Sequence, residues 1–367
     1  MSRDLNVALA HDWLNGMRGG ERCLDLICRE FPRAELYTLL HRPELVSEAI
    51  RNRPVHASGL QRLPFFREHY RWFLPLFPAA IEAFRLPAGT DLVISTSHCV
   101  AKGIVPPPGA KHLCYCFTPM RYAWSLQEEY FGRNRLKRAA LDLALARLRR
   151  WDRAASARVD RFVAISRHVQ ARIREHYGRD AAVVYPPVAT QYFTPDARGG
   201  HDGYDLVVSA LVPYKRVDLA VRTYARTGYP LKVAGVGTEL AALRRQAGPN
   251  VEFLGRVPDE GVRELYRRCR FLVFPGEEDF GIVPLEAQAC GKPVLAYGKG
   301  GLLETVVEGR TGVFFAEQTE AALAGAAERA AGTAWDAAEI RAHAEQFDEA
   351  RFLDGLRAEI GRLLEGR

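Results

Sequence analysis

The chain has 367 residues, of which 48% are hydrophobic and 26% are charged, as is usual for a globular protein with an apolar core. No apolar run approaches the roughly 20 residues that a membrane-spanning helix needs. The seven cysteines are odd in number and lack C-x-x-C spacing, which argues for a reducing compartment and against a zinc site. The N-terminal stretch enters a strand pattern without a secretory hydrophobic region, so we expect a cytoplasmic protein, long enough for two domains.

The net charge of +7 is concentrated in one segment, residues 131–161. Ten Lys or Arg and three Asp lie there, so the segment carries +7 and the rest of the chain is neutral. A localised positive surface indicates an anionic partner, and we expect an anionic membrane, at which the protein would be peripheral. A solvated helix face is the alternative. Nucleic acid is not expected, because no recognised nucleic-acid motif accompanies the charge.

The first predicted strand, residues 5–10, runs into a turn that contains Gly19 and Gly20 and then into a helix at 23–31. In such turns backbone amides can approach a phosphate, although turns also need glycine for steric reasons. Farther along, residues 60–86 mix seven aromatic side chains with arginines. They predict a helical hairpin in the core, with a surface for a membrane or a lipid acceptor as the alternative.

Three further strands of the first domain are predicted. Residues 91–98 end at His98, a position suited to ligands as well as to structural hydrogen bonds, and residues 112–117 lead into the stretch 118–124. A later strand, 161–166, ends in Ser166, which can cap the following helix. Residues 194–204 then have the composition of a linker.

The second domain is predicted to open with a strand that begins at Asp205. Lys215 and Arg216 follow this strand at the start of a helix over 217–225, and cations beside helix-start amides suit a diphosphate. Further strands are expected at 231–234 and 251–257, and beyond Glu317 the chain reads as alanine-rich helix.

Residues 270–301 predict a strand, a loop, a short helix and another strand. Pro284 suits the first position of the helix, and Gly291 suits the position after its end. Glu278 and Glu286 flank the loop with seven residues between them. Carboxylate acceptors beside the amides of a helix start are what a polyhydroxylated ligand needs. An acidic surface loop, with Glu286 stabilised by the helix dipole, is the alternative.

The stretch E-E-D-F-G-I-V-P-L-E-A-x-A-C-G-x-P-V at residues 277–294 resembles the E-x7-E signature of retaining GT-B glycosyltransferases that use nucleotide sugars. The match continues through residues 298–306. The resemblance implies an α/β fold of two Rossmann-like domains that face each other across a cleft. Their expected extents are 1–193 for the acceptor side and 204–345 for the nucleotide sugar, with 346–367 as a final helix that packs back on the first domain.

The resemblance also implies roles for individual residues. The catalytic residues would be His98, Lys215 and Glu278. Glu278 and the amides of 280–282 would contact the donor sugar, Glu286 the ribose, and His98 would lie next to that sugar. The donor-binding residues would be Gly19, Gly20, Arg216, Arg256, Val257, Phe280, Gly281, Ile282 and Glu286. The acceptor side would include Asp12, Trp13 and Arg121.

Two positions depart from the pattern of this family. Cys116-Phe117-Thr118-Pro119 stands where bacterial surface-polysaccharide mannosyltransferases usually have C-H-T-P, so one polar side chain is missing. Ala210 stands where the family usually has an arginine. The second cation for the diphosphate would then be Arg216, Arg256 or a first-domain arginine such as Arg18.

The reaction that the resemblance implies is the retaining transfer of a hexose, mannose from GDP-mannose or a sugar from a UDP-linked donor. The acceptor would be a saccharide or a lipid-linked saccharide in surface glycan assembly. The chain has no D-x-D pair, so we expect no metal and no further cofactor, and Lys215 and Arg216 would neutralise the leaving diphosphate. The expected route is a front-face displacement in which the phosphate acts as base. Alternatives are a sugar-nucleotide epimerase, a glycan phosphorylase, and a membrane-associated sugar-nucleotide-binding protein with little turnover.

Overall fold

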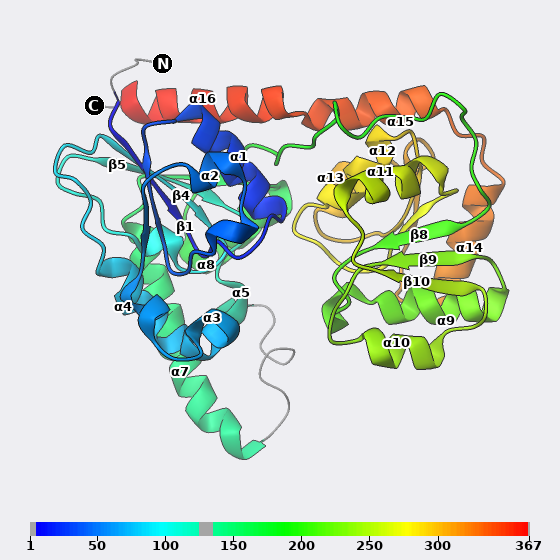
Figure 1. Cartoon of the computed structure of the whole chain (residues 1–367), viewed down its shortest axis with the longest axis horizontal. Coiled ribbons are helices and arrows are strands. Elements are labelled where there is room, and N and C mark those ends of the chain that lie inside the picture. Colours follow the sequence, from blue (N-terminus) through cyan, green and yellow to red (C-terminus); the bar gives the residue numbers. More distant parts are fainter. Residues whose placement is uncertain (1–4, 125–134, 366–367) are drawn as a thin grey trace. The chain divides into compact units, whose positions relative to one another are not determined.

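The computed structural model describes residues 5–124 and 135–365, and only the backbone of residues 135–141. The chain forms two compact units, Met1–Pro186 together with Phe352–Arg367, and Pro187–Arg351 (Figure 1). Each unit is a parallel sheet with helices on both faces, so the predicted α/β fold of two Rossmann-like domains is confirmed.

The first unit contains a seven-stranded parallel sheet in the order β3-β2-β1-β4-β5-β6-β7. Its strands are β1 Val7–His11, β2 Glu35–Thr38, β3 Val55–Ala57, β4 Leu92–Ser97, β5 Lys111–Cys116, β6 Arg161–Ala164 and β7 Ala181–Val183. The central strands are short apolar runs buried on both faces, as expected for a parallel sheet. The order of connection reverses between β1 and β4, which is where such sheets bind ligands.

The helices of the first unit include two long ones, α7 and α16. Its α-helices are α1 Gly19–Glu30, α2 Glu48–Arg51, α3 Phe66–His69, α4 Phe77–Glu82, α5 Arg121–Trp124, α7 Arg135–Ala157, α8 Arg167–Tyr177 and most of α16 Glu349–Glu365. Its 3-10 helices are η1 Pro43–Leu45, η2 Gly59–Arg62, η3 Tyr70–Leu76 and η4 Ala101–Gly103. As predicted, Ser166 caps α8, because its hydroxyl accepts a hydrogen bond from the amide of Val169 at 3.0 Å.

The segment 60–86 differs from the helical hairpin that we predicted. It forms four short helical pieces, η2, α3, η3 and α4, with Pro75 inside η3. Proline removes one backbone donor, which interrupts a longer helix here. At the end of the chain, α16 packs on the first unit, where Phe352 meets Tyr115 edge-on and Arg357 pairs with Glu30 at 2.6 Å.

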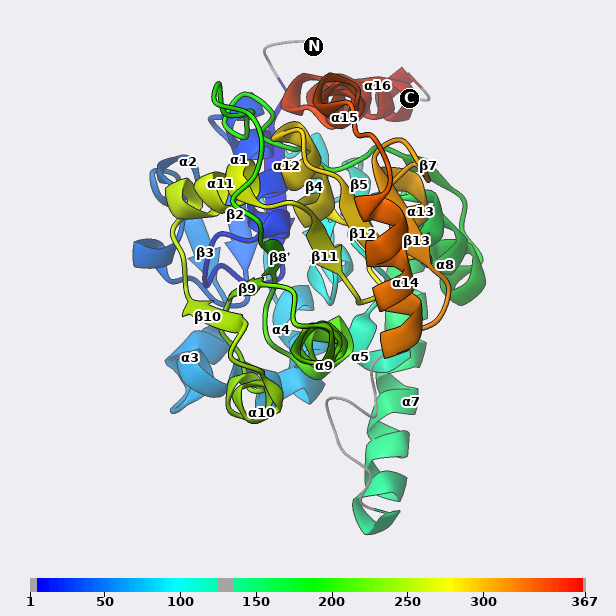
Figure 2. The same cartoon turned by 90° about the vertical axis from the view of Figure 1, so that its right-hand side faces the viewer.

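The second unit contains a six-stranded parallel sheet in the order β10-β9-β8-β11-β12-β13. Its strands are β8 Asp205–Val208, β9 Leu231–Ala234, β10 Val251–Gly255, β11 Leu272–Phe274, β12 Val294–Tyr297 and β13 Gly312–Phe315. Its helices are η5 Pro213–Lys215, α9 Val217–Thr227, α10 Leu240–Gln246, α11 Asp259–Arg268, α12 Ile282–Ala289, α13 Leu302–Thr305, α14 Glu320–Ala331, α15 Ala337–Ala344 and η6 Glu345–Phe347. Helices α9, α10 and α14 cover one face of the sheet and α11 and α12 the other (Figures 1 and 2). The connection order reverses between β8 and β11.

Residues 194–204, which we predicted to be a linker, lie within the second unit and are fastened to α11. Arg268 pairs with Asp196 at 3.4 Å and also with Asp202. Arg267 donates to the carbonyl of Thr194 at 2.7 Å. These contacts hold the irregular segment against the end of a helix.

Candidate active site

Lys215 and Glu278 meet at the point in the second unit where the strand order reverses. Lys215 ends η5, the turn after β8, and Glu278 lies in the loop after β11, the neighbouring strand. The ammonium Nζ of Lys215 lies 2.5 Å from Oε1 of Glu278, and the two side chains keep 16% and 21% of their surface exposed. A cation and a carboxylate are thus both accessible at the edge of the sheet that binds ligands in this topology.

The backbone around this ion pair is closely packed. A Cβ at Gly276 would lie 3.0 Å from the Cα and the carbonyl oxygen of Lys215, closer than most side chains approach, so glycine there lets the two loops pack tightly. The Lys215 ammonium also lies over the rings of Tyr214 and Phe274, 5.3 and 5.6 Å from their centroids. These aromatic faces favour the cation and help to fix its position.

Arg216 has a different orientation from its neighbour. Its backbone is left-handed, with φ of 51°, and its guanidinium donates to Oε1 of Gln318 at 2.8 Å and to Asp218 at 3.2 Å. Gln318 in turn donates to the carbonyl of Pro275 at 2.8 Å. Arg216 is therefore linked to the loop that carries Glu278 through Gln318.

The loop that carries Glu278 leads into the start of α12. Gly281, with φ of 104°, precedes the helix, and α12 begins at Ile282, two residues earlier than the start we predicted at Pro284. Phe280 is buried. The carbonyl of Glu278 accepts a hydrogen bond from the amide of Gly301 at 2.8 Å, so the turn after β12 fixes the loop from outside. First-turn amides of a helix lack acceptors within the helix and favour oxygen-rich ligands.

Glu286 lies one turn into α12, and 8% of its surface is exposed. Its Oε2 accepts a hydrogen bond from the hydroxyl of Tyr266 at 3.0 Å. Burial, and secondly the charge of Glu286, raise the pKa of Tyr266 far above its usual value, so the phenol keeps its proton and donates. We did not predict Tyr266 from the sequence, because only the packing of α11 on α12 brings it to Glu286.

Arg256 and Val257 are not brought to the ion pair. They follow β10, which is the edge strand and is separated from β8 by β9. Arg256 is exposed. Ala210, the position at which the family usually has arginine, is also exposed, in the loop after β8.

In the first unit, Asp12 and His98 meet where the order of connection reverses between β1 and β4. The Asp12 carboxylate accepts hydrogen bonds from four successive amides, those of residues 98–101, at 2.6–2.9 Å. It also lies 3.1 Å from Nδ1 of His98. Burial opposes its ionisation, but His98, His11 and these amides outweigh burial, so the pKa of Asp12 is lowered.

The imidazole of His98 is half-buried, with 30% of its side chain exposed. The ring of Trp13 meets it edge-on with the centroids 4.5 Å apart. Burial lowers the pKa of His98; Asp12 opposes this shift, and Arg121 and Arg18 add to it. The imidazole is therefore mainly neutral near pH 7 and can both donate and accept a hydrogen bond.

The side chains of Asp12 and Trp13, which we expected on the acceptor side, are buried, with 0% and 3% of their surface exposed. They support His98 and its loop and do not reach the surface. Arg121 is half-buried at the start of α5.

Gly19 and Gly20 form the start of α1, four residues earlier than the helix start that we predicted. A Cβ at Gly20 would lie 3.2 Å from the ring of Phe117, so the ring of Phe117 packs directly on the helix start. The Phe117 ring is also 6.4 Å from the rings of both His11 and His98. An apolar ring thus occupies the side of this turn that faces the two histidines.

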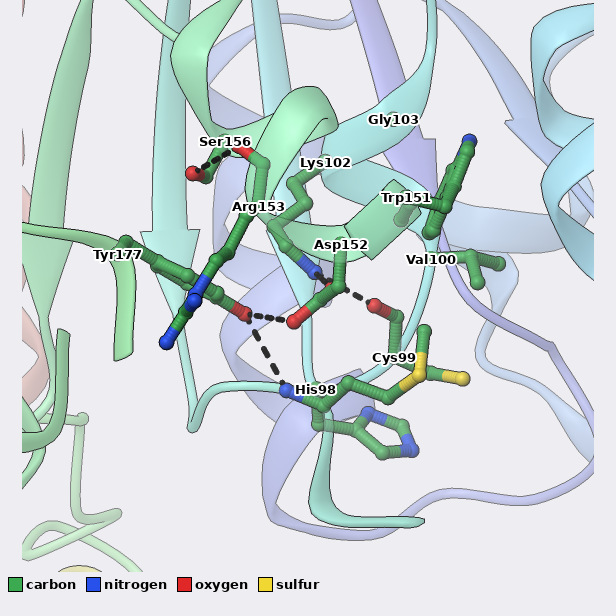
Figure 3. Close-up of polar contacts among 12 residues, drawn as sticks. His98, Cys99, Val100, Lys102, Gly103, Trp151, Asp152, Arg153, Ser156 and Tyr177 are labelled. Carbon is green, nitrogen blue, oxygen red and sulfur yellow. Dashed lines mark hydrogen bonds and ion pairs between the residues drawn. The ribbon is translucent and has the colours of Figure 1, made fainter. Parts of the chain in front are cut away.

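A buried polar network fixes the other end of the His98 loop (Figure 3). Lys102, 1% exposed, donates to the carbonyl of Cys99 at 2.8 Å and forms an ion pair with Asp152 of α7. The second oxygen of Asp152 accepts from Trp124 at 2.8 Å and from the hydroxyl of Tyr177 at 2.7 Å. The only sequence signal was a lysine within an apolar run, and its partner is 50 positions away.

Comparison with known proteins agrees with this fold. Residues 198–344 match the family model Glycosyl transferases group 1, and residues 17–192 match the family model Glycosyltransferase Family 4. The chain is 45% identical to alpha-1,3/1,6-mannosyltransferase alg-2 of Neurospora crassa over 113 residues, 30% of this chain and 23% of that protein.

A second relative is the GDP-mannose-dependent alpha-(1-6)-phosphatidylinositol monomannoside mannosyltransferase of Mycolicibacterium smegmatis. It is 33% identical over 178 residues, 40% of this chain and 47% of that protein. The chain thus spans less than half the length of these relatives.

Among solved structures, the Anabaena protein HepE in complex with UDP superposes with a TM-score of 0.71 at 18% identity, over 98% of this chain and 100% of that one. The chain therefore has the GT-B fold. No helix among the described residues is long and apolar enough to cross a bilayer.

Proposed function

We propose that this chain, which has the fold of GT-B glycosyltransferases, transfers a hexose from a sugar nucleotide to an acceptor hydroxyl with retention of configuration. The donor that we propose is GDP-mannose, since two relatives are named as mannosyltransferases and one of them as GDP-mannose-dependent. The acceptor that we propose is a saccharide or a lipid-linked saccharide. The observation that carries the proposal is the Lys215–Glu278 ion pair at the reversal of strand order in the second unit.

In the proposed reaction, the two side chains of the ion pair separate when the donor binds, and each then contacts a different part of the donor. Lys215 turns its ammonium to the diphosphate and stabilises the charge that grows as the sugar–phosphate bond breaks. Glu278 then accepts a hydrogen bond from a sugar hydroxyl, a bond to a charged acceptor and therefore a strong one. Both residues already lie at this edge of the sheet before the donor binds, so only their side chains need to move.

The remaining residues take binding roles in this proposal. Glu286, oriented by Tyr266, accepts from the ribose hydroxyls, and the amides of Gly281 and Ile282 donate to the sugar. For His98 we propose a hydrogen bond to the reacting sugar, with Asp12 and Trp13 as positioning residues. We propose that the leaving phosphate acts as the base in a front-face displacement and that no metal is required.

The test is a thermal-shift screen with GDP-mannose, UDP-glucose, UDP-galactose and the free nucleotides, followed by product analysis. Stabilisation by GDP-mannose that Lys215→Ala weakens, and transfer with the α configuration kept, are the expected results. Incubation with donor alone would reveal an epimerase, and donor plus orthophosphate would reveal a phosphorylase. Binding without any product would favour a binding protein, and stabilisation only by uridine compounds would favour a UDP-sugar donor.

A further inference from the structure

The segment Arg62–Leu76, which contains η3 and α3, exposes an unusual set of large apolar side chains. Four residues within 14 positions are strongly exposed: Leu63 at 40%, Phe65 at 72%, Trp72 at 74% and Leu76 at 47%. Single exposed apolar residues are normal, but several on one short segment mark a surface that contacts a membrane, a protein partner or a ligand.

The inward side chains of the same segment show that this exposure is not due to a loose fold. Phe66, Tyr70 and Leu74 are buried, in one cluster with Trp13. Tyr70 lies 5.1 Å from Trp13, ring to ring. The segment is therefore anchored through its inner face, and its outer face is left apolar.

Phe65 and Trp72 are the two exposed aromatic residues of this segment. Phe65 adopts a left-handed backbone with φ of 61°, a conformation that costs a bulky residue energy and that glycine or asparagine would adopt more easily. No burial of its ring compensates this cost. Trp72 stacks on His69, with the ring centroids 4.2 Å apart and the planes 7° from parallel. The ring of Trp72 is thus held in position by His69, and the ring of Phe65 projects from a strained turn.

The charges on this segment are mixed with the aromatic rings. Arg62, Arg67 and Arg71 are exposed, and Glu68 is the only acidic residue between Arg62 and Leu76, so the segment carries +2. Tryptophan, phenylalanine and arginine side by side are typical of surfaces at the boundary between lipid headgroups and acyl chains. Arginines also attract anionic headgroups.

The strongly basic segment 131–161 is a weaker candidate for such contact than its charge indicates. Residues 131–134 and the side chains of residues 135–141, with four of the ten basic residues of the segment, lie outside the described part of the chain. Of the six arginines between residues 142 and 161, four bind within the first unit: Arg149 to the carbonyl of Ala123, Arg153 to that of His176, Arg158 to Glu82 and Arg161 to Glu359. The other two, Arg147 and Arg150, are exposed.

We propose that the Arg62–Leu76 surface docks on an anionic lipid bilayer, with Phe65 and Trp72 inserted among the headgroups. The binding itself does not depend on the proposed reaction. If that reaction is correct, docking brings the bilayer close to Tyr70 and Trp13, whose rings pack beneath His98. A lipid-linked acceptor held in the bilayer would then lie near His98.

The experiment is flotation of the full chain with vesicles of phosphatidylcholine, with and without phosphatidylglycerol. We expect binding that requires phosphatidylglycerol and is only partly removed by salt, because apolar insertion is not screened. Phe65→Ser and Trp72→Ser should each weaken binding by about tenfold, the effect of losing a large part of one aromatic contact. Vesicle binding should also change the fluorescence emission of Trp72. Trp72→Phe should retain binding and remove this change.

The matched controls are Leu303→Ser and Tyr229→Ser, at 58% and 47% exposure in the second unit, which should bind as wild type. Thermal unfolding of each variant checks that the fold is kept, as expected for exposed positions. Loss of binding in Arg147→Glu/Arg150→Glu with no effect of Phe65→Ser and Trp72→Ser would overturn the proposal in favour of α7. Absence of vesicle binding, or self-association that Trp72→Ser abolishes, would overturn it in favour of a protein partner or a second copy.

Discussion

Lys215 and Glu278 are 63 positions apart in sequence, yet the ammonium of one lies 2.5 Å from the carboxylate of the other. The contact exists because β8 and β11, which precede the two residues, are neighbours at the reversal of strand order. Since Gly276 lets the two backbones approach, the pair is built into the loops and is not formed by two long side chains on an open surface. Its two charges can be tested separately.

Glu278→Gln should retain the fold and reduce turnover between about tenfold and 100-fold. The substitution replaces a charged acceptor by a neutral one, a loss of about 1.5–3 kcal/mol for a sugar hydroxyl. Initial-rate kinetics with saturating donor measure the effect. Glu277→Gln is the matched control, because Glu277 is adjacent and exposed and pairs with Lys299 at 3.5 Å. Equal rates in both variants would remove Glu278 from the proposed site.

Lys215→Ala should lower turnover at least tenfold, about 1.4 kcal/mol or more, because the leaving diphosphate loses its cation. Ala210→Arg tests whether that cation is sufficient. Ala210 is exposed, and Arg216 is already held by Gln318 and Asp218. We expect Arg216, which is adjacent to Lys215, to supply the second charge, so Ala210→Arg should change donor affinity little. A large gain in affinity, measured by calorimetry, would show an under-charged site and favour the binding-protein alternative.

The fold and the ends of the second-unit strands could be predicted from the sequence because their signals are local. The run 271–274, the prolines and Gly291 define the strand, loop and helix around Glu278 without any distant contact. The hydroxyl of Ser166 also needs only the amide three residues later, and this cap is confirmed. The short strands β2, β3, β7 and β13 were missed. β11 is as short as these, but it was predicted because Pro275 and Gly276 mark its end after an apolar run.

What the sequence could not predict depends on contacts between distant segments. The partners of Lys102 and Glu286 come from α7 and α11, and no pattern in the chain specifies how these helices pack. Asp12 is the clearest case. A polar residue after a first strand resembles a ligand-binding residue, but four amides from the neighbouring strand's loop occupy its carboxylate. A buried carboxylate must find such partners, and only the tertiary structure supplies them.

Asp12→Asn should destabilise the first unit by at least about 2 kcal/mol, since one amide oxygen cannot replace a carboxylate that accepts four hydrogen bonds. The pKa of His98 should also fall further, because Asp12 raises it. Urea unfolding and the NMR titration of His98 measure the two effects. Asp25→Asn is the control: Asp25 pairs with side chains of Arg29 and Ser47, which can turn to water. A His98 pKa that does not change would contradict the geometry.

The stability of the first unit should fall as the pH is lowered from 6.5 towards 4. Burial lowers the pKa of His11 and of His112 to about 4, whereas both titrate near 6.5 in the unfolded chain. Within that window the unfolded state binds more protons, so acid favours unfolding, by up to about 1.4 kcal/mol per pH unit for each histidine. Above pH 6.5 neither state binds these protons and the dependence ends.

His112→Gln separates this effect from the titration of carboxylates. Nε2 of His112 lies 2.8 Å from the hydroxyl of Ser95, a contact that a glutamine side chain can replace without taking up a proton. The free energy of unfolding, measured in urea at pH 7 and pH 5, should therefore differ less between the two pH values in the variant than in the wild type. Measurements at pH 5 avoid most of the carboxyl range, since aspartate and glutamate titrate near pH 4. An unchanged slope would mean that His112 is protonated in the folded chain, and that its buried hydrogen bond to Ser95 does not depend on the neutral imidazole.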